Sequence, residues 1–134
     1  MMDIKQLSLL ELQPSQFYIS QEKMERIERW FDSGDLSAFQ PIPVKLLDDN
    51  KPVMTDGHTR AVVALRAGIT NVPLCWDEDD LDWEMYRACV VACNERGIYS
   101  PADLMGRIVD AAAYQEKWEL WCDRMQADVM ARRL

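Results

Sequence analysis

The stretch Thr55-Asp56-Gly57-His58-Thr59-Arg60 decides the fold of this chain, because the hydrophobic pattern changes its period there. Immediately before it, the short apolar run 52–54 is typical of a strand. After it, apolar residues recur at helical spacing over 61–65 and stop before Gly68, which predicts a helix that ends at a glycine cap. Residues 72–76 then predict another strand. Together these segments form a compact α/β unit.

The residues that precede this unit predict a strand, a helix and a hairpin. Residues 4–12 alternate loosely between apolar and polar side chains, which predicts a first strand. Helical spacing of apolar residues over 24–31 predicts a helix, and Ser20 is its expected N-cap. Residues 41–54 then read as two strands joined by the polar turn Asp48-Asp49-Asn50-Lys51.

Beyond residue 80 only helical spacing is found. A helix is expected over 81–93, with its end near Gly97. Ser100-Pro101 predicts an N-cap followed by proline at the first position of a second helix, which we expect over 102–110. A last helix is expected from about residue 111 to 125.

The length of 134 residues suits one compact domain, or one domain with a helical appendage. We therefore predict an α/β (α+β) fold. Residues 1–80 are expected to form a small mixed sheet with helices, and residues 81–134 an all-helical C-terminal extension packed on it. A strongly negative run, Asp77-Glu78-Asp79-Asp80, marks the boundary and reads as a solvated linker.

The net charge of -8 opposes non-specific attraction to nucleic acid or to anionic membranes. The two helices around Gly97 have the outline of a helix-turn-helix, but Arg107 is the one basic residue in the expected second helix. That helix is therefore interpreted as a packing or dimerisation element, and a homodimer through the C-terminal helices is the assembly it allows. No apolar run approaches the ~20 residues that span a bilayer, and no signal-peptide profile precedes the first strand, so a cytoplasmic protein is expected.

The four cysteines include no Cys-x-x-Cys pair. Zinc binding by four thiolates is the alternative, but reduced, buried cysteines suit this spacing better. They are Cys75, Cys89, Cys93 and Cys122.

The motif at the helix start has the chemistry of a phosphate site. A helix that follows a tight glycine turn presents unpaired backbone N–H groups and the positive end of its dipole. Gly57 supplies the turn, His58 and Thr59 can donate hydrogen bonds, and Arg60 can hold phosphate oxygens in a bidentate way. Asp56 can bind magnesium or accept a proton. The alternative is structural: Asp-Gly is a common turn, and a histidine near a helix start is often a cap.

Several ordered segments resemble the N-terminal domain of ParB-like proteins, and the resemblance covers about residues 4–76. It implies a ParB/sulfiredoxin-like fold, with phosphates held at the helix start. The segments are 9–14, 40–44, 55–61, 67–69 and 72–74.

Within this superfamily the motif separates three activities. In ParB proteins the helix start reads Gly-Glu-Arg-Arg and holds CTP; Gly57 and Arg60 match it, whereas His58 and Thr59 depart from it. Sulfiredoxins carry a catalytic cysteine where this chain has His58, which excludes their chemistry at this site. The ParB-fold free serine kinases carry Asp-Gly-His-Thr/His-Arg, and that resemblance implies Asp56 as the catalytic base. Those kinases also use a glutamate from the N-terminal region, where this chain offers Gln16.

Two functions follow as hypotheses. The first is a small-molecule phosphotransferase that uses Asp56 as base or metal ligand and binds ATP, ADP or CTP, with Mg²⁺, through Gln16 and the segment 57–60. Its second substrate would be a small hydroxyl-bearing compound. The alternative is a non-catalytic nucleotide-sensing or protein-interaction module. DNA partition or nuclease activity is disfavoured by the charge.

Overall fold

The strands that flank the motif lie in one mixed sheet of three strands, as the change of period predicts. The computed structural model describes residues 2–48 and 51–134. In this sheet β2 (Ile42–Lys45) is central, between antiparallel β3 (Val53–Met54) and parallel β4 (Leu74–Trp76). The predicted β2–β3 hairpin is confirmed, and residues 49–50 of its expected turn lie outside the described residues.

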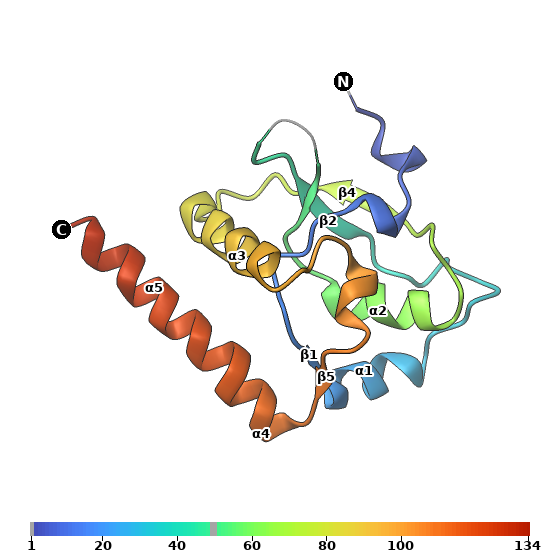
Figure 1. The fold of residues 1–134 in the computed structure, drawn as a ribbon. Helices are drawn as coiled ribbons and strands as arrows, with labels where there is room; N and C mark the ends of the chain where they lie inside the picture. The colour runs from blue at the N-terminus through green and yellow to red at the C-terminus, as the bar shows by residue number, and fades with distance from the viewer. Residues whose placement is uncertain (1, 49–50) are drawn as a thin grey trace.

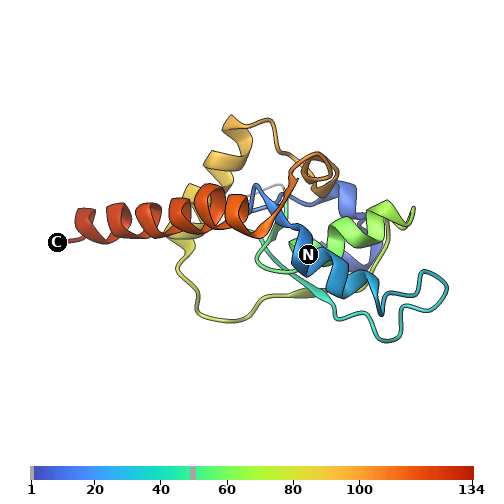
Figure 2. The same cartoon turned by 90° about the horizontal axis from the view of Figure 1, so that it is seen from below.

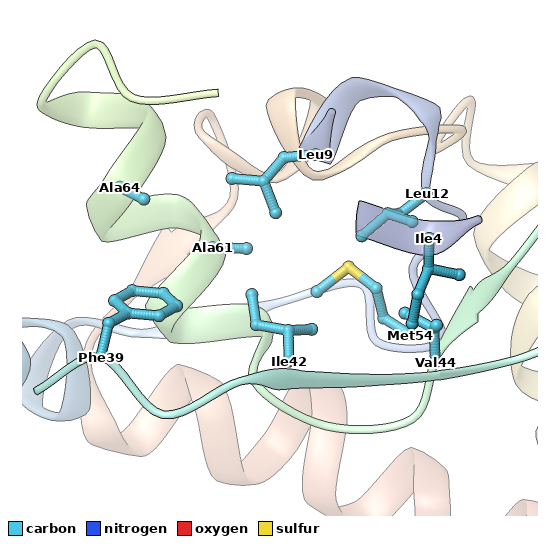
Figure 3. Packing of buried hydrophobic residues seen from close by; sticks show 9 residues of the cluster. All are labelled: Ile4, Leu9, Leu12, Phe39, Ile42, Val44, Met54, Ala61 and Ala64. Atoms are coloured by element: carbon cyan, nitrogen blue, oxygen red, sulfur yellow. The ribbon is translucent and has the colours of Figure 1, made fainter. Parts of the chain in front are cut away.

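The helix α2 (His58–Arg66) links β3 to β4 and packs between the sheet and helix α1 (Gln21–Glu28) (Figure 1). On the side of the sheet α2 contributes the small side chains Ala61 and Ala64, so the helix can approach the sheet closely. Figure 3 shows how the core between them is filled by side chains of β2, β3, α2 and the N-terminal segment. The buried residues of this cluster are Ile4, Leu9, Leu12, Phe39, Ile42, Val44, Met54, Ala61 and Ala64.

The prediction of a strand over residues 4–12 is wrong. This segment forms two short 3-10 turns, η1 (Ile4–Gln6) and η2 (Leu9–Glu11). Local capping overrides the alternating pattern, because the Ser8 hydroxyl and the Glu11 carboxylate satisfy each other's backbone N–H groups in a capping box. Pairing with the sheet begins only at Gln13, which bridges Val53.

The helix predicted after Ser20 is confirmed as α1 (Gln21–Glu28). The Ser20 hydroxyl accepts a hydrogen bond from the Lys23 backbone N–H at 3.2 Å, as expected of an N-cap. The helix ends earlier than the pattern predicts, so Trp30 lies beyond its last residue. Immediately before α1, the two residues Ile19–Ser20 form the short strand β1.

The C-terminal half begins with the predicted helix, α3 (Trp83–Glu95), but the helix expected over 102–110 is wrong. In its place are a 3-10 turn, η3 (Pro101–Leu104), and a strand, β5 (Ile108–Val109), which pairs in parallel with β1. The β-branched pair of β5 favours extended backbone, and Arg107 Nε donates to the Phe17 carbonyl at 2.6 Å. The helix-turn-helix outline is therefore absent, and the C-terminal segment is not all-helical.

The last part of the chain is one continuous helix. It comprises α4 (Ala111–Tyr114), the π-helical turn η4 (Gln115–Glu119) and α5 (Leu120–Arg132). Figures 1 and 2 show it running along one side of the molecule, with its C-terminal end beyond the rest of the chain. Trp118 and Trp121 pack edge-on against Phe17, each with ring centroids 4.9 Å away.

These elements confirm the predicted α+β class with a C-terminal helical segment. Within residues 2–48 and 51–134, no helix combines the length and the apolar character needed to cross a membrane.

Candidate functional site

The turn between β3 and α2 favours glycine at position 57. Gly57 has φ 79°, in the left-handed region that side chains disfavour. A Cβ at this position would lie 2.6 Å from Nη2 of Arg60, so a larger residue here would displace the guanidinium that folds back over the turn. The Gly57 N–H donates to Oδ1 of Asp56 at 2.8 Å, which leaves the other carboxylate oxygen of this exposed residue open.

The first turn of α2 is open to an anion. The first helical hydrogen bond runs from the Ala61 N–H to the Gly57 carbonyl at 3.0 Å, so the N–H groups of His58, Thr59 and Arg60 have no acceptor within the helix. Gly57, as the N-cap, provides no side-chain acceptor either. Arg60 Nη1 donates to Oε1 of Gln40 at 3.0 Å, which holds the guanidinium beside this helix start.

His58 has a structural bond that the sequence does not reveal. Its side chain is 4% exposed, and its Nε2 accepts a hydrogen bond from the Ser15 backbone N–H at 3.0 Å. Burial lowers the pKa of His58 to about 4, against the partial opposition of the Asp56 charge, so the ring is neutral at pH 7. The sequence predicts that His58 donates a hydrogen bond to phosphate. This prediction is wrong for Nε2, which accepts a hydrogen bond from Ser15.

Gln16 lies beside the motif, but both of its N–H donors have partners within the chain. Its Nε2 donates to the Tyr18 carbonyl at 2.7 Å and to the Tyr114 hydroxyl at 3.2 Å. Gln16 therefore presents its carbonyl oxygen rather than a donor, and it ties the N-terminal loop to the C-terminal helix. Lys23 lies over the face of the same Tyr114 ring, with Nζ 5.1 Å from the centroid.

All six residues predicted for the site line one cavity of about 440 Å³. Of its described lining residues, Asp56 is the acidic one, whereas Lys23, Arg26 and Arg60 are cationic. Arg26 also forms an exposed ion pair with Glu22. The complete lining is Gln16, Lys23, Arg26, Ile27, Trp30, Gln40, Asp56, Gly57, His58, Thr59, Arg60 and Tyr114.

The sequence interpretation missed the contributions of α1 and of the C-terminal helix. Lys23 and Arg26 are three residues apart in α1 and so lie on one face of the helix, which is the one available signal. Tertiary packing, and not the spacing, determines which face of α1 lies against α2. Tyr114 reaches the site through the pairing of β1 with β5, an element that was predicted as helix.

The described cysteines and acidic residues do not gather into a metal centre. Among the described residues, no three His, Cys, Asp or Glu side chains are grouped so that they could hold a metal ion. All four cysteines are free thiols. Burial raises the pKa of Cys89 to about 11 and that of Cys93 to about 12, so both remain protonated at neutral pH.

The sequence matches no protein-family model and no curated protein. Among solved structures, the crystal structure of protein Atu1540 from Agrobacterium tumefaciens is similar, with a TM-score of 0.45 and 13% sequence identity. The similarity covers 78% of this chain and 60% of that chain. At this level it assigns neither a family nor an activity.

The lowered pKa of His58 predicts a loss of stability in acid. In the unfolded chain the His58 imidazole binds a proton below about pH 6.5, but in the folded chain it does so only below about pH 4. The free energy of unfolding therefore falls as the pH decreases between these values. Between about pH 7 and about pH 4.5, the wild type should lose roughly 2 kcal/mol more unfolding free energy than His58→Gln, which has no titrating ring. Urea unfolding at both pH values measures this, and equal losses would contradict the assignment.

Proposed function

We propose that this chain binds a nucleotide by its phosphates at the start of α2 and transfers a phosphoryl group to the hydroxyl of a small molecule. The observation that carries the proposal is the convergence of Lys23, Arg26 and Arg60 with the open first turn of α2 in one cavity. Charge-assisted hydrogen bonds to phosphate are stronger than neutral ones, and a helix start adds aligned N–H donors.

The cavity favours a nucleotide over free phosphate because it has an apolar part. At about 440 Å³ it is within the range of small-molecule sites. Ile27 and Trp30 line it beside the cations, and Trp30 is 47% exposed, so its ring is the group that would stack on a base. Stacking of this kind tolerates any base, so the base identity stays open among ATP, ADP and CTP.

Asp56 is the residue placed to act on the acceptor. As the acceptor oxygen bonds to the terminal phosphorus, the bridging P–O bond of the nucleotide breaks and the shortened nucleotide leaves. The hydroxyl proton passes to the Asp56 carboxylate, whose orientation is set by the Gly57 N–H. The resemblance of this motif to that of the ParB-fold free serine kinases supports the same role.

The donor set fits a magnesium ion that is held mainly by the nucleotide. Mg²⁺ in phosphoryl-transfer sites binds one or two carboxylates together with substrate phosphates, and Asp56 offers an exposed carboxylate next to the phosphate-binding turn. When bound, the ion would neutralise charge that develops on the phosphate oxygens.

A second candidate is a nucleotide-sensing module without catalysis. It is favoured by Gln16, which occupies the region where the serine-kinase resemblance expects a glutamate and whose amide is bonded to Tyr18 and Tyr114. With Asp56 as the acidic residue among the described lining residues, the chain can bind a nucleotide yet lack a second carboxylate for the acceptor. Phosphoryl transfer by the wild type distinguishes the two functions.

Replacing Arg60 by Ala should weaken ATP binding by roughly ten- to a hundred-fold, because it removes a charge-assisted contact worth ~1.5 to 3 kcal/mol. Arg66→Ala is the matched control, because Arg66 lies at the other end of the same helix and pairs with Glu28. Calorimetric titration of both variants measures the effect. Equal affinities in wild type and folded Arg60→Ala would rule out phosphate binding at this helix start.

Replacing Trp30 by Ala should lower the affinity for ATP by roughly tenfold and leave that for tripolyphosphate unchanged, since stacking on a base contributes ~1 to 3 kcal/mol. Trp30→Phe keeps a ring and should restore most of the ATP affinity. If both ligands weaken equally, Trp30 does not contact a base.

Replacing Asp56 by Asn should reduce phosphotransfer by roughly a hundred-fold or more while nucleotide binding persists. The amide oxygen can still accept the Gly57 N–H, so the turn is preserved. A panel of hydroxyl acceptors that includes free serine, with Asp80→Asn as an exposed acidic control, measures the rate. An unimpaired Asp56→Asn variant would reduce Asp56 to a turn residue, and a wild type that binds nucleotide but phosphorylates no acceptor would favour the sensing module.

A further inference from the structure

A second cavity of about 330 Å³ lies beside the first and shares part of its wall. Gln16, Asp56 and His58 line both cavities, so a group at Asp56 is accessible from either side. The second cavity is bounded by α3 and by the C-terminal helix, neither of which belongs to the strand–helix–strand unit that carries the motif.

The wall away from Asp56 is apolar and deformable. Leu81 and Met85 line it from the side of α3, and Trp118 and Met125 line it from the C-terminal helix. Thioether side chains adapt to irregular shapes and make favourable contacts with aromatic rings, so this wall suits a flat apolar body.

The lining carries little charge. Burial raises the pKa of Cys122 to about 12, so this thiol in the wall is neutral, as is that of Cys89. Asp82 is bound by Arg133, with an N···O distance of 2.8 Å. Among the described lining residues there is no lysine or arginine, so a carboxylate ligand such as an amino acid would meet no opposite charge.

We propose that this second cavity binds the acceptor, and that the acceptor is a small uncharged alcohol with an aromatic body whose hydroxyl lies at Asp56. The inference rests on the phosphotransfer function proposed above and defines its substrate class. The ring packs among the methionines and Trp118, and the hydroxyl faces the wall shared with the nucleotide cavity. The two substrates thus approach Asp56 from different sides.

The experiment is a calorimetric titration of the full chain with phenylpropanol, compared with ethanol and free serine, without nucleotide. Burial of the ring should make phenylpropanol bind at least about tenfold more tightly than ethanol. Met125→Trp narrows the cavity and should weaken phenylpropanol binding by about tenfold. Met130→Trp is the matched control, because Met130 is on the same helix but is 53% exposed and outside the cavity, and it should bind phenylpropanol like the wild type.

If Met125→Trp unfolds, as thermal melting would show, Cys122→Phe fills the same cavity from the neighbouring turn and should have the same effect. Phenylpropanol affinity no higher than that of ethanol, or unchanged in both filled variants, overturns the proposal. ATP titration of the same proteins keeps the two proposals separate. A wild type that binds ATP but not phenylpropanol refutes this inference alone, whereas a wild type that does not bind ATP refutes the nucleotide site.

Discussion

The hydrogen bond from the Ser15 backbone N–H to His58 Nε2 joins two segments that are 43 residues apart in the chain. It is reinforced by the Ser15 hydroxyl, which donates to the Met54 carbonyl at 2.6 Å. Together these bonds fix the N-terminal loop against the start of α2. Because an unpaired polar group costs most in a dry interior, the loop position depends on a neutral imidazole that can accept. Phe17, which follows Ser15 and Gln16 in the same loop, is the residue against which Trp118 and Trp121 of the C-terminal helix pack.

The charge distribution is compatible with the anion site proposed for this acidic chain. The protein carries a net charge of -8, yet Lys23, Arg26 and Arg60 gather around a single helix start. Charges beyond about 8 Å are largely screened at physiological ionic strength, so a ligand within the cavity senses mainly these neighbours. Duplex DNA would instead need an extended cationic surface, because its affinity depends on the number of phosphates neutralised. The proposed small phosphorylated ligand therefore fits this charge distribution better than duplex DNA would.

Sequence patterns predicted the elements whose signals are local, and failed where the signal depends on distant partners. The change from strand to helical period at Gly57 and the cap at Ser20 are encoded within a few residues, and both are found in the structure. The strand predicted over 4–12 failed because a capping box competes with weak alternation. The acceptor role of His58 needs a backbone N–H from another segment, and the approach of Lys23 to the site needs the packing of α1 on α2. Neither can be read from spacing.

The turn at Asp56 and Gly57 couples the two parts of the proposed reaction. The left-handed conformation of Gly57 sets the direction of the first N–H groups of α2. The missing side chain of this glycine leaves space for the Arg60 guanidinium. The N–H of the same glycine holds one oxygen of Asp56, whose side chain lines both the cavity at the start of α2 and the second cavity. A change in this turn therefore moves the phosphate donors and the carboxylate together. In the proposed reaction, phosphate binding and proton acceptance would share one backbone geometry, and both would depend on glycine at position 57.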